Sequence, residues 1–124
     1  MKKRLLLCAA SLFFLCPFPV WGGGNLEMHV IDVGQGEAIL LSTPDGSHLL
    51  IDAGNLSAGH RVRQYLKNRQ IAVLDAVIIT HMHPDHVGGL FALAPDLTIK
   101  MLYDHGDIRK DDVFGNQYIR LANH

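Results

Sequence analysis

The chain has 124 residues, a length that predicts a single domain, and its 11 Lys and Arg residues are balanced by 12 Asp and Glu residues. This balance excludes a global basic field of the kind that attracts nucleic acid or anionic membranes. Three of the eight histidines lie within six positions, and both cysteines lie in the first 16 residues.

The first 22 residues have the pattern of an export signal. A basic start, residues 2–4, comes before a run from Leu5 to Cys16 that is apolar except for one serine. This order is typical of a secretory signal, and the run is shorter than the ~20 apolar residues of a membrane-spanning helix. We therefore expect a signal peptide at 1–22 and export of residues 23–124 to the periplasm or the extracellular space. The alternative is an uncleaved membrane anchor.

Strand patterns come first in residues 23–124, and helix patterns join them further along the chain. Leu26 to Val33 alternates and contains several β-branched residues, which indicates a strand. Residues 72–79 are almost entirely apolar, which predicts a strand buried on both faces. The full prediction is a strand at 26–33, a hairpin at 37–52 with its turn at 44–47, a helix at 59–69, a strand at 72–79, a helix at 84–94, a strand at 97–103 and a helix at 110–122. Such a mixture favours a layered α/β fold.

Three histidines and one aspartate follow the predicted buried strand directly. His81 and His83 are two positions apart, so they project to the same side of an extended segment. Two neutral imidazoles suit Zn²⁺, with manganese or iron as alternatives. Asp85 and His86 follow at the predicted start of a helix and can face a second metal position. A polar turn explains Asp85, but not three clustered histidines, whose unpaired burial would be costly.

The histidine-rich segment resembles a known family motif. Residues 81–86, His-Met-His-Pro-Asp-His, are similar to the His-x-His-x-Asp-His motif of the metallo-β-lactamase superfamily. Residues 32–38, Asp-Val-Gly-Gln-Gly-Glu-Ala, resemble a segment of one branch, typified by the hydrolase-like domain of the competence protein ComEC. Glu37 stands where that branch has Asp. Residues 50–54 and 102–106 are similar to a strand-ending Asp-x-Gly and to a later loop of the branch.

The resemblance implies an αββα sandwich, of which this chain is the N-terminal portion and therefore incomplete. The implied metal ligands are His81 and His83 for a first ion, and Asp85 and His86 for a second. Asp85 is also the candidate catalytic residue, because it would help to accept a proton. The resemblance places Asp52 and Gln35 beside the ligands, and a simple turn is the alternative role for both.

The implied function is that of a metal-dependent hydrolase with one or two zinc ions, in which metal-bound hydroxide attacks an ester or phosphodiester-type substrate. The substrate would be a small molecule or a nucleic-acid phosphodiester, and thioesters and lactams remain open. We expect no stable membrane partner and no protein partner. The family needs further ligands downstream, for which His105 and His124 are weak candidates, so we expect these 124 residues alone to be inactive. The alternative is an exported metal-binding or inactive truncated module without catalysis.

Overall fold

The structure, a computed structural model, describes residues 23–106, 108 and 113–123. The expected signal peptide at 1–22 lies outside these residues. The elements in chain order are β1 (Glu27–Val30), β2 (Ile39–Ser42), β3 (His48–Ile51), the short 3₁₀ helix η1 (Leu56–Ala58), α1 (Gly59–Asn68), β4 (Val73–Leu74), β5 (Ala76–Ile79), α2 (Pro84–Leu93), the 3₁₀ helix η2 (Ala94–Asp96), β6 (Thr98–Ile99), β7 (Leu102–Asp104) and α3 (Val113–Ala122). Across the described ranges, no helix combines the length and apolar character that crossing a membrane requires.

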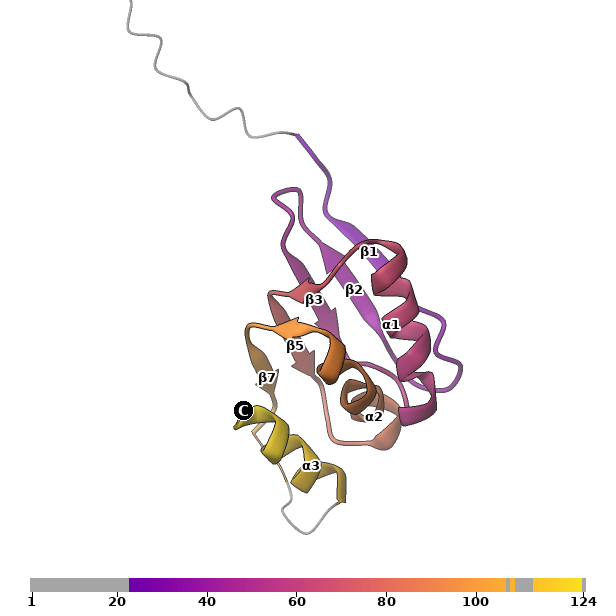
Figure 1. Ribbon diagram of the computed structural model, residues 1–124, viewed down its shortest axis with the longest axis vertical. Helices are drawn as coiled ribbons and strands as arrows, with labels where there is room; N and C mark the ends of the chain where they lie inside the picture. Colours follow the sequence, from indigo (N-terminus) through magenta and orange to yellow (C-terminus); the bar gives the residue numbers. More distant parts are fainter. Residues whose placement is uncertain (1–22, 107, 109–112, 124) are drawn as a thin grey trace, which may run out of the picture.

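Five strands form the main sheet, in the order β1-β2-β3-β5-β7. Strands β1, β2 and β3 pair antiparallel, so the hairpin predicted at 37–52 is confirmed. Strands β3, β5 and β7 run parallel, and β4 pairs with β6 in a second, two-stranded sheet. Figure 1 shows α1 and α2 side by side against the main sheet, with α3 next to α2. The predicted α/β layering is therefore present.

The two faces of the main sheet have different surroundings. Leu40, Leu50 and Val77 are cross-strand neighbours on one face, and each is fully buried with apolar residues of α1 and α2. On the other face, Met28 is 66% exposed and Val30 is 73% exposed. Burial of one apolar face against helices stabilises the sheet, and it holds the carboxyl ends of β3 and β5 in fixed positions.

Two predicted strands are in fact broken, each into two. The strand predicted at 72–79 divides at Asp75 into β4 and β5, which belong to different sheets. Asp75 lies between the two strands. Its carboxylate accepts hydrogen bonds from the His48 main-chain N–H at 2.8 Å and from Lys100 Nζ at 2.6 Å, and these bonds stabilise the break. The strand predicted at 97–103 also divides, at Lys100 and Met101, between β6 and β7.

The remaining elements lie where they were predicted, with shifted ends. Strand β1 ends at Val30 and not at Val33, and the helices predicted at 59–69 and 84–94 are α1 and α2. The helical tail is α3, whose described residues begin at Val113.

Candidate metal centre

The predicted site residues lie at one edge of the main sheet. Asp52 follows the last residue of β3, and Thr80 and His81 follow the last residue of β5. These two strands are parallel neighbours, so their carboxyl ends meet at the same edge. Loops that leave such a rigid platform are common locations for functional residues.

Asp52 is the buried centre of this edge. Its side chain is fully buried, and its main chain has a φ of +54°, which aspartate tolerates better than most residues. One carboxylate oxygen accepts from the Thr80 main-chain N–H at 2.9 Å. The other accepts from the Thr80 hydroxyl at 2.6 Å and from His86 Nδ1 at 2.7 Å. Three donors therefore offset the cost of burying this charge.

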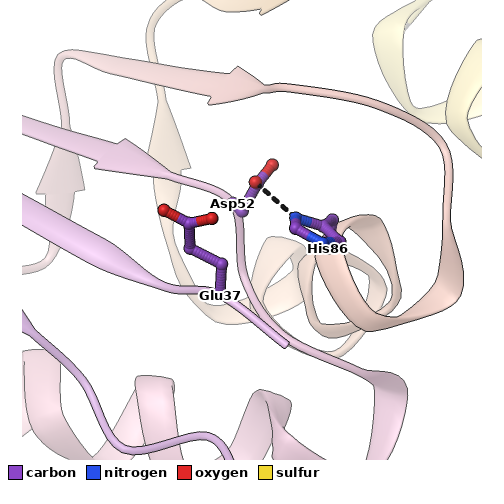
Figure 2. A group of neighbouring side chains, drawn as sticks. All are labelled: Glu37, Asp52 and His86. Atoms are coloured by element: carbon purple, nitrogen blue, oxygen red, sulfur yellow. Dashed lines mark hydrogen bonds and ion pairs between the residues drawn. The ribbon is translucent and has the colours of Figure 1, made fainter. Parts of the chain in front are cut away.

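His86 lies in the first turn of α2 and faces Asp52, as Figure 2 shows. A carboxylate can only accept hydrogen bonds, so His86 carries its proton on Nδ1. Nε2 of the neutral ring is then left with a free lone pair. Metal-binding histidines typically have this carboxylate partner, which orients the ring and increases its basicity.

A second histidine is oriented by Asp52 through Thr80. The Thr80 hydroxyl donates to Asp52, and its oxygen lies 3.0 Å from Nδ1 of His81. Nδ1 of His81 therefore donates to Thr80, and Nε2 of His81 is the unprotonated nitrogen. This nitrogen lies 3.0 Å from Nδ1 of His83. Two nitrogens on one tetrahedral zinc ion would lie about 3.3 Å apart, given Zn–N bonds of about 2.0–2.1 Å.

The rings of the three predicted histidine ligands lie close to one another. The rings of His81 and His86 have centroids 4.0 Å apart, and those of His81 and His83 are 4.6 Å apart. Neutral imidazoles whose second nitrogen is held by an oxygen are preferred zinc ligands. These donors are of the type that zinc prefers, and ligation by His81, His83 and His86 stays a prediction, because the compact group of possible ligands among the described residues is Glu37, Asp52 and His86.

Glu37 and Thr80 were not predicted as site residues. Glu37, Asp52 and His86 each offer a ligand atom within 4.8 Å of those of the other two. Glu37 was noted only as the carboxylate that replaces an Asp in the Gly-Gln-Gly segment, and its position depends on how two distant loops pack. Thr80 had one sequence signal, its place between the apolar strand and the first histidine.

Close main-chain packing holds the first turn of α2 against the loop after β3. The Ala53 N–H donates to the His86 carbonyl at 2.8 Å, and the Gly89 N–H donates to the Gly54 carbonyl at 2.8 Å. A Cβ atom on Gly89 would lie 1.9 Å from the Ala53 carbonyl oxygen, so only glycine fits there. The distance between Asp52 and His86 is therefore fixed by the main chain.

The other predicted site residues, Asp85 and Gln35, make main-chain contacts with neighbouring segments. Asp85 is in the first turn of α2, and its carbonyl oxygen accepts from the Glu37 N–H at 3.2 Å. Gln35 is exposed, and its carbonyl oxygen accepts from Asn55 Nδ2 at 3.4 Å. Metal ligation by Asp85 and a metal-side role for Gln35 stay predictions. His105 is exposed in the loop after β7, and position 124 lies outside the described residues.

Comparison with known proteins gives the family. The family model described as Metallo-beta-lactamase superfamily matches residues 31–110. The chain therefore belongs to the metallo-β-lactamase superfamily, members of which typically bind zinc.

Two curated relatives match part of the chain. A hydroxyacylglutathione hydrolase from Shewanella loihica is 38% identical over 81 residues, which are 64% of this chain and 26% of that protein. ComE operon protein 3 of Bacillus subtilis is 28% identical over 113 residues, which are 77% of this chain and 14% of that protein. The resemblance to the competence branch is thus confirmed as a distant one, and the chain spans only a small part of either relative.

Solved structures confirm the fold. A metallo-beta-lactamase motif mutant from Cronobacter sakazakii has a TM-score of 0.56 and 24% identity, over 75% of this chain and 36% of that one. The metallo-beta-lactamase SMB-1 in complex with mercaptoacetic acid has a TM-score of 0.56 and 24% identity, over 67% of this chain and 33% of that one. The chain therefore has the metallo-β-lactamase-like α/β fold and spans about a third of the length of these two neighbours.

Proposed function

We propose that the protein is a metal-dependent hydrolase whose zinc site includes His81, His83 and His86. The observation that carries this proposal is the fixed orientation of two rings. Asp52 accepts from Nδ1 of His86 directly and orients His81 through the Thr80 hydroxyl. A histidine group with no metal role would not need one buried carboxylate to orient two of its rings.

The site residues would have different roles in metal binding and hydrolysis. When bound, zinc lowers the pKa of water towards 7 and polarises a substrate carbonyl or phosphoryl oxygen. His81 and His83 would hold one ion through the two nitrogens that lie 3.0 Å apart. His86 would present Nε2, with Asp85 as a further ligand and proton acceptor. Asp52 keeps the rings in place and would contact no substrate, because it is fully buried.

The substrate is proposed as an ester or phosphodiester, with thioesters and lactams as alternatives in the same site. The chain spans 26% and 14% of its curated relatives, so this activity is proposed for the whole protein. The superfamily's hydrolytic members support the reaction type, and a phosphodiester is proposed from the resemblance of residues 32–38 to the competence branch. Export through residues 1–22 is proposed on the sequence pattern, and N-terminal sequencing of the secreted protein would test it.

Zinc content and hydrolysis together test the proposal. We expect elemental analysis of the purified protein to find one or two zinc ions, and a chromogenic phosphodiester or ester to be cleaved. His81→Ala should lose both zinc and activity. His60→Ala is the matched control, because His60 is exposed on α1 and its Nδ1 lies 2.5 Å from the Ser57 carbonyl oxygen. A stable protein that takes up no zinc would refute the proposal. Zinc uptake without hydrolysis by the whole protein would favour the metal-binding module.

A further inference from the structure

Glu37 has a half-buried carboxylate that the proposed site does not use. In Figure 2 this carboxylate lies beside Asp52, and the hydrogen bond between Asp52 and His86 is on the other side of Asp52. A ligand atom of Glu37 lies within 4.8 Å of those of both other residues. Among the described residues, no hydrogen bond to the Glu37 carboxylate is found, whereas Asp52 has three.

The main chain holds Glu37 in this position from two sides. Its N–H donates to the Asp85 carbonyl at 3.2 Å, and its carbonyl accepts from the Gly54 N–H at 2.7 Å. The preceding residue, Gly36, has a φ of +122°, and a Cβ atom there would lie 2.1 Å from the Asp85 carbonyl oxygen. The loop before β2 is thus packed against the two loops that carry the other site residues. The Glu37 side chain therefore starts from a fixed point beside the metal centre.

This arrangement is unfavourable without a cation. Two carboxylates within 4.8 Å repel each other, and burial strengthens the repulsion because it lowers the local dielectric constant. The donors found on Asp52 are the Thr80 N–H, the Thr80 hydroxyl and Nδ1 of His86, and among the described residues none of these groups donates to Glu37. A cation bound at Nε2 of His86 would balance this extra charge.

We propose that Glu37 is a positioning residue of the metal site, which acts through the Asp52–His86 pair. Its negative charge favours the proton on Nδ1 of His86 and so favours a free Nε2 that can bind zinc. The inference rests on the proposed zinc site and adds a carboxylate outside the histidine motif. It also assigns a role to position 37, where the related branch has Asp. An aspartate there would supply the same negative charge.

The test compares Glu37→Gln and Glu37→Asp in the full chain, with two measurements for each variant. The first is the zinc dissociation constant, measured by competition with a fluorescent chelator. We expect Glu37→Gln to weaken zinc binding about tenfold and Glu37→Asp to keep it within about threefold. The second is the thermal midpoint of the metal-free chain. Glu37→Gln should raise this midpoint, because it removes the repulsion with Asp52, whereas loss of a purely structural contact would lower it.

Glu27→Gln is the matched control. Glu27 is also a glutamate beside a histidine, with a carboxylate oxygen 3.0 Å from Nε2 of His29, but it lies on β1. It should leave zinc binding unchanged. Unchanged zinc binding in Glu37→Gln, or a lower metal-free midpoint in both Glu37 variants, overturns the inference and leaves the proposed function intact. Absence of zinc binding by the unmodified chain overturns both.

Discussion

Replacement of Asp52 by asparagine is the sharpest perturbation of the site. The substitution keeps the shape of the side chain, and asparagine also tolerates the φ of +54°. It replaces one acceptor oxygen with an NH₂ group, although three donors from Thr80 and His86 converge on the two oxygens. In either orientation of the amide, at least one donor meets another donor.

The magnitude follows from these bonds. A hydrogen bond to a charged group contributes about 1.5–3 kcal/mol, and the bonds that survive become neutral and weaker. Thr80 is exposed and the His86 side chain is 18% exposed, so water can partly replace the lost bonds. We therefore expect the free energy of unfolding to fall by about 2–3 kcal/mol. Zinc affinity should fall about 10–100-fold, because both oriented rings lose their carboxylate partner.

Denaturant unfolding of the metal-free protein and chelator competition measure these two effects. Asp75→Asn is the matched control, because Asp75 also accepts a main-chain and a side-chain hydrogen bond but lies at the β4–β5 break. The Lys100 ammonium group holds the pKa of Asp75 below its usual value. The stability that the Asp75 charge contributes, and that Asp75→Asn removes, should therefore be fully present above the usual aspartate pKa of 3.8 and disappear as pH falls through the lowered pKa, while zinc affinity should stay unchanged. Equal zinc affinity in Asp52→Asn and the unmodified protein would refute the assignment of Asp52 as the orienting carboxylate.

Three further predictions concern other parts of the molecule. Gly89→Ala should lower the free energy of unfolding by about 3 kcal/mol, as measured by denaturant unfolding, because the new Cβ atom would collide with the Ala53 carbonyl oxygen. Gly23→Ala is the control and should have no effect, because no atom lies within 4 Å of a Cβ at that position. Thr80→Val should lower zinc affinity about tenfold in chelator competition. An unchanged affinity would show that the Thr80 hydroxyl has no role in zinc binding. Burial and a nearby carboxylate raise the pKa of Tyr118 above its usual 10.0, so stability should fall as pH rises above this value, where only the unfolded chain ionises. Tyr118→Phe should flatten this fall in unfolding curves measured from pH 8 upwards.

The sequence predicted best what depends on neighbours in the chain. The proximity of His81 and His83 follows from their spacing, and the helices follow from local periodicity. The break at Asp75 was missed because it depends on donors from His48 and Lys100, which lie 27 and 25 residues away. Glu37 was missed for the same reason, since its place in the site comes from packing between separate loops.

Asp52 shows why the site and the stability of this corner of the fold cannot be separated. A fully buried carboxylate is costly unless donors surround it, and the hydrogen bonds to Asp52 come from Thr80 and His86. The same bonds leave Nε2 unprotonated on His81 and His86. Any change that improves the packing of this corner by removing the charge would therefore also remove the orientation of the rings. A bound metal ion would instead favour both the ring orientation and the stability of this corner. It would bind the ring nitrogens that do not contact Asp52 or Thr80, and should protect the Asp52 loop from unfolding.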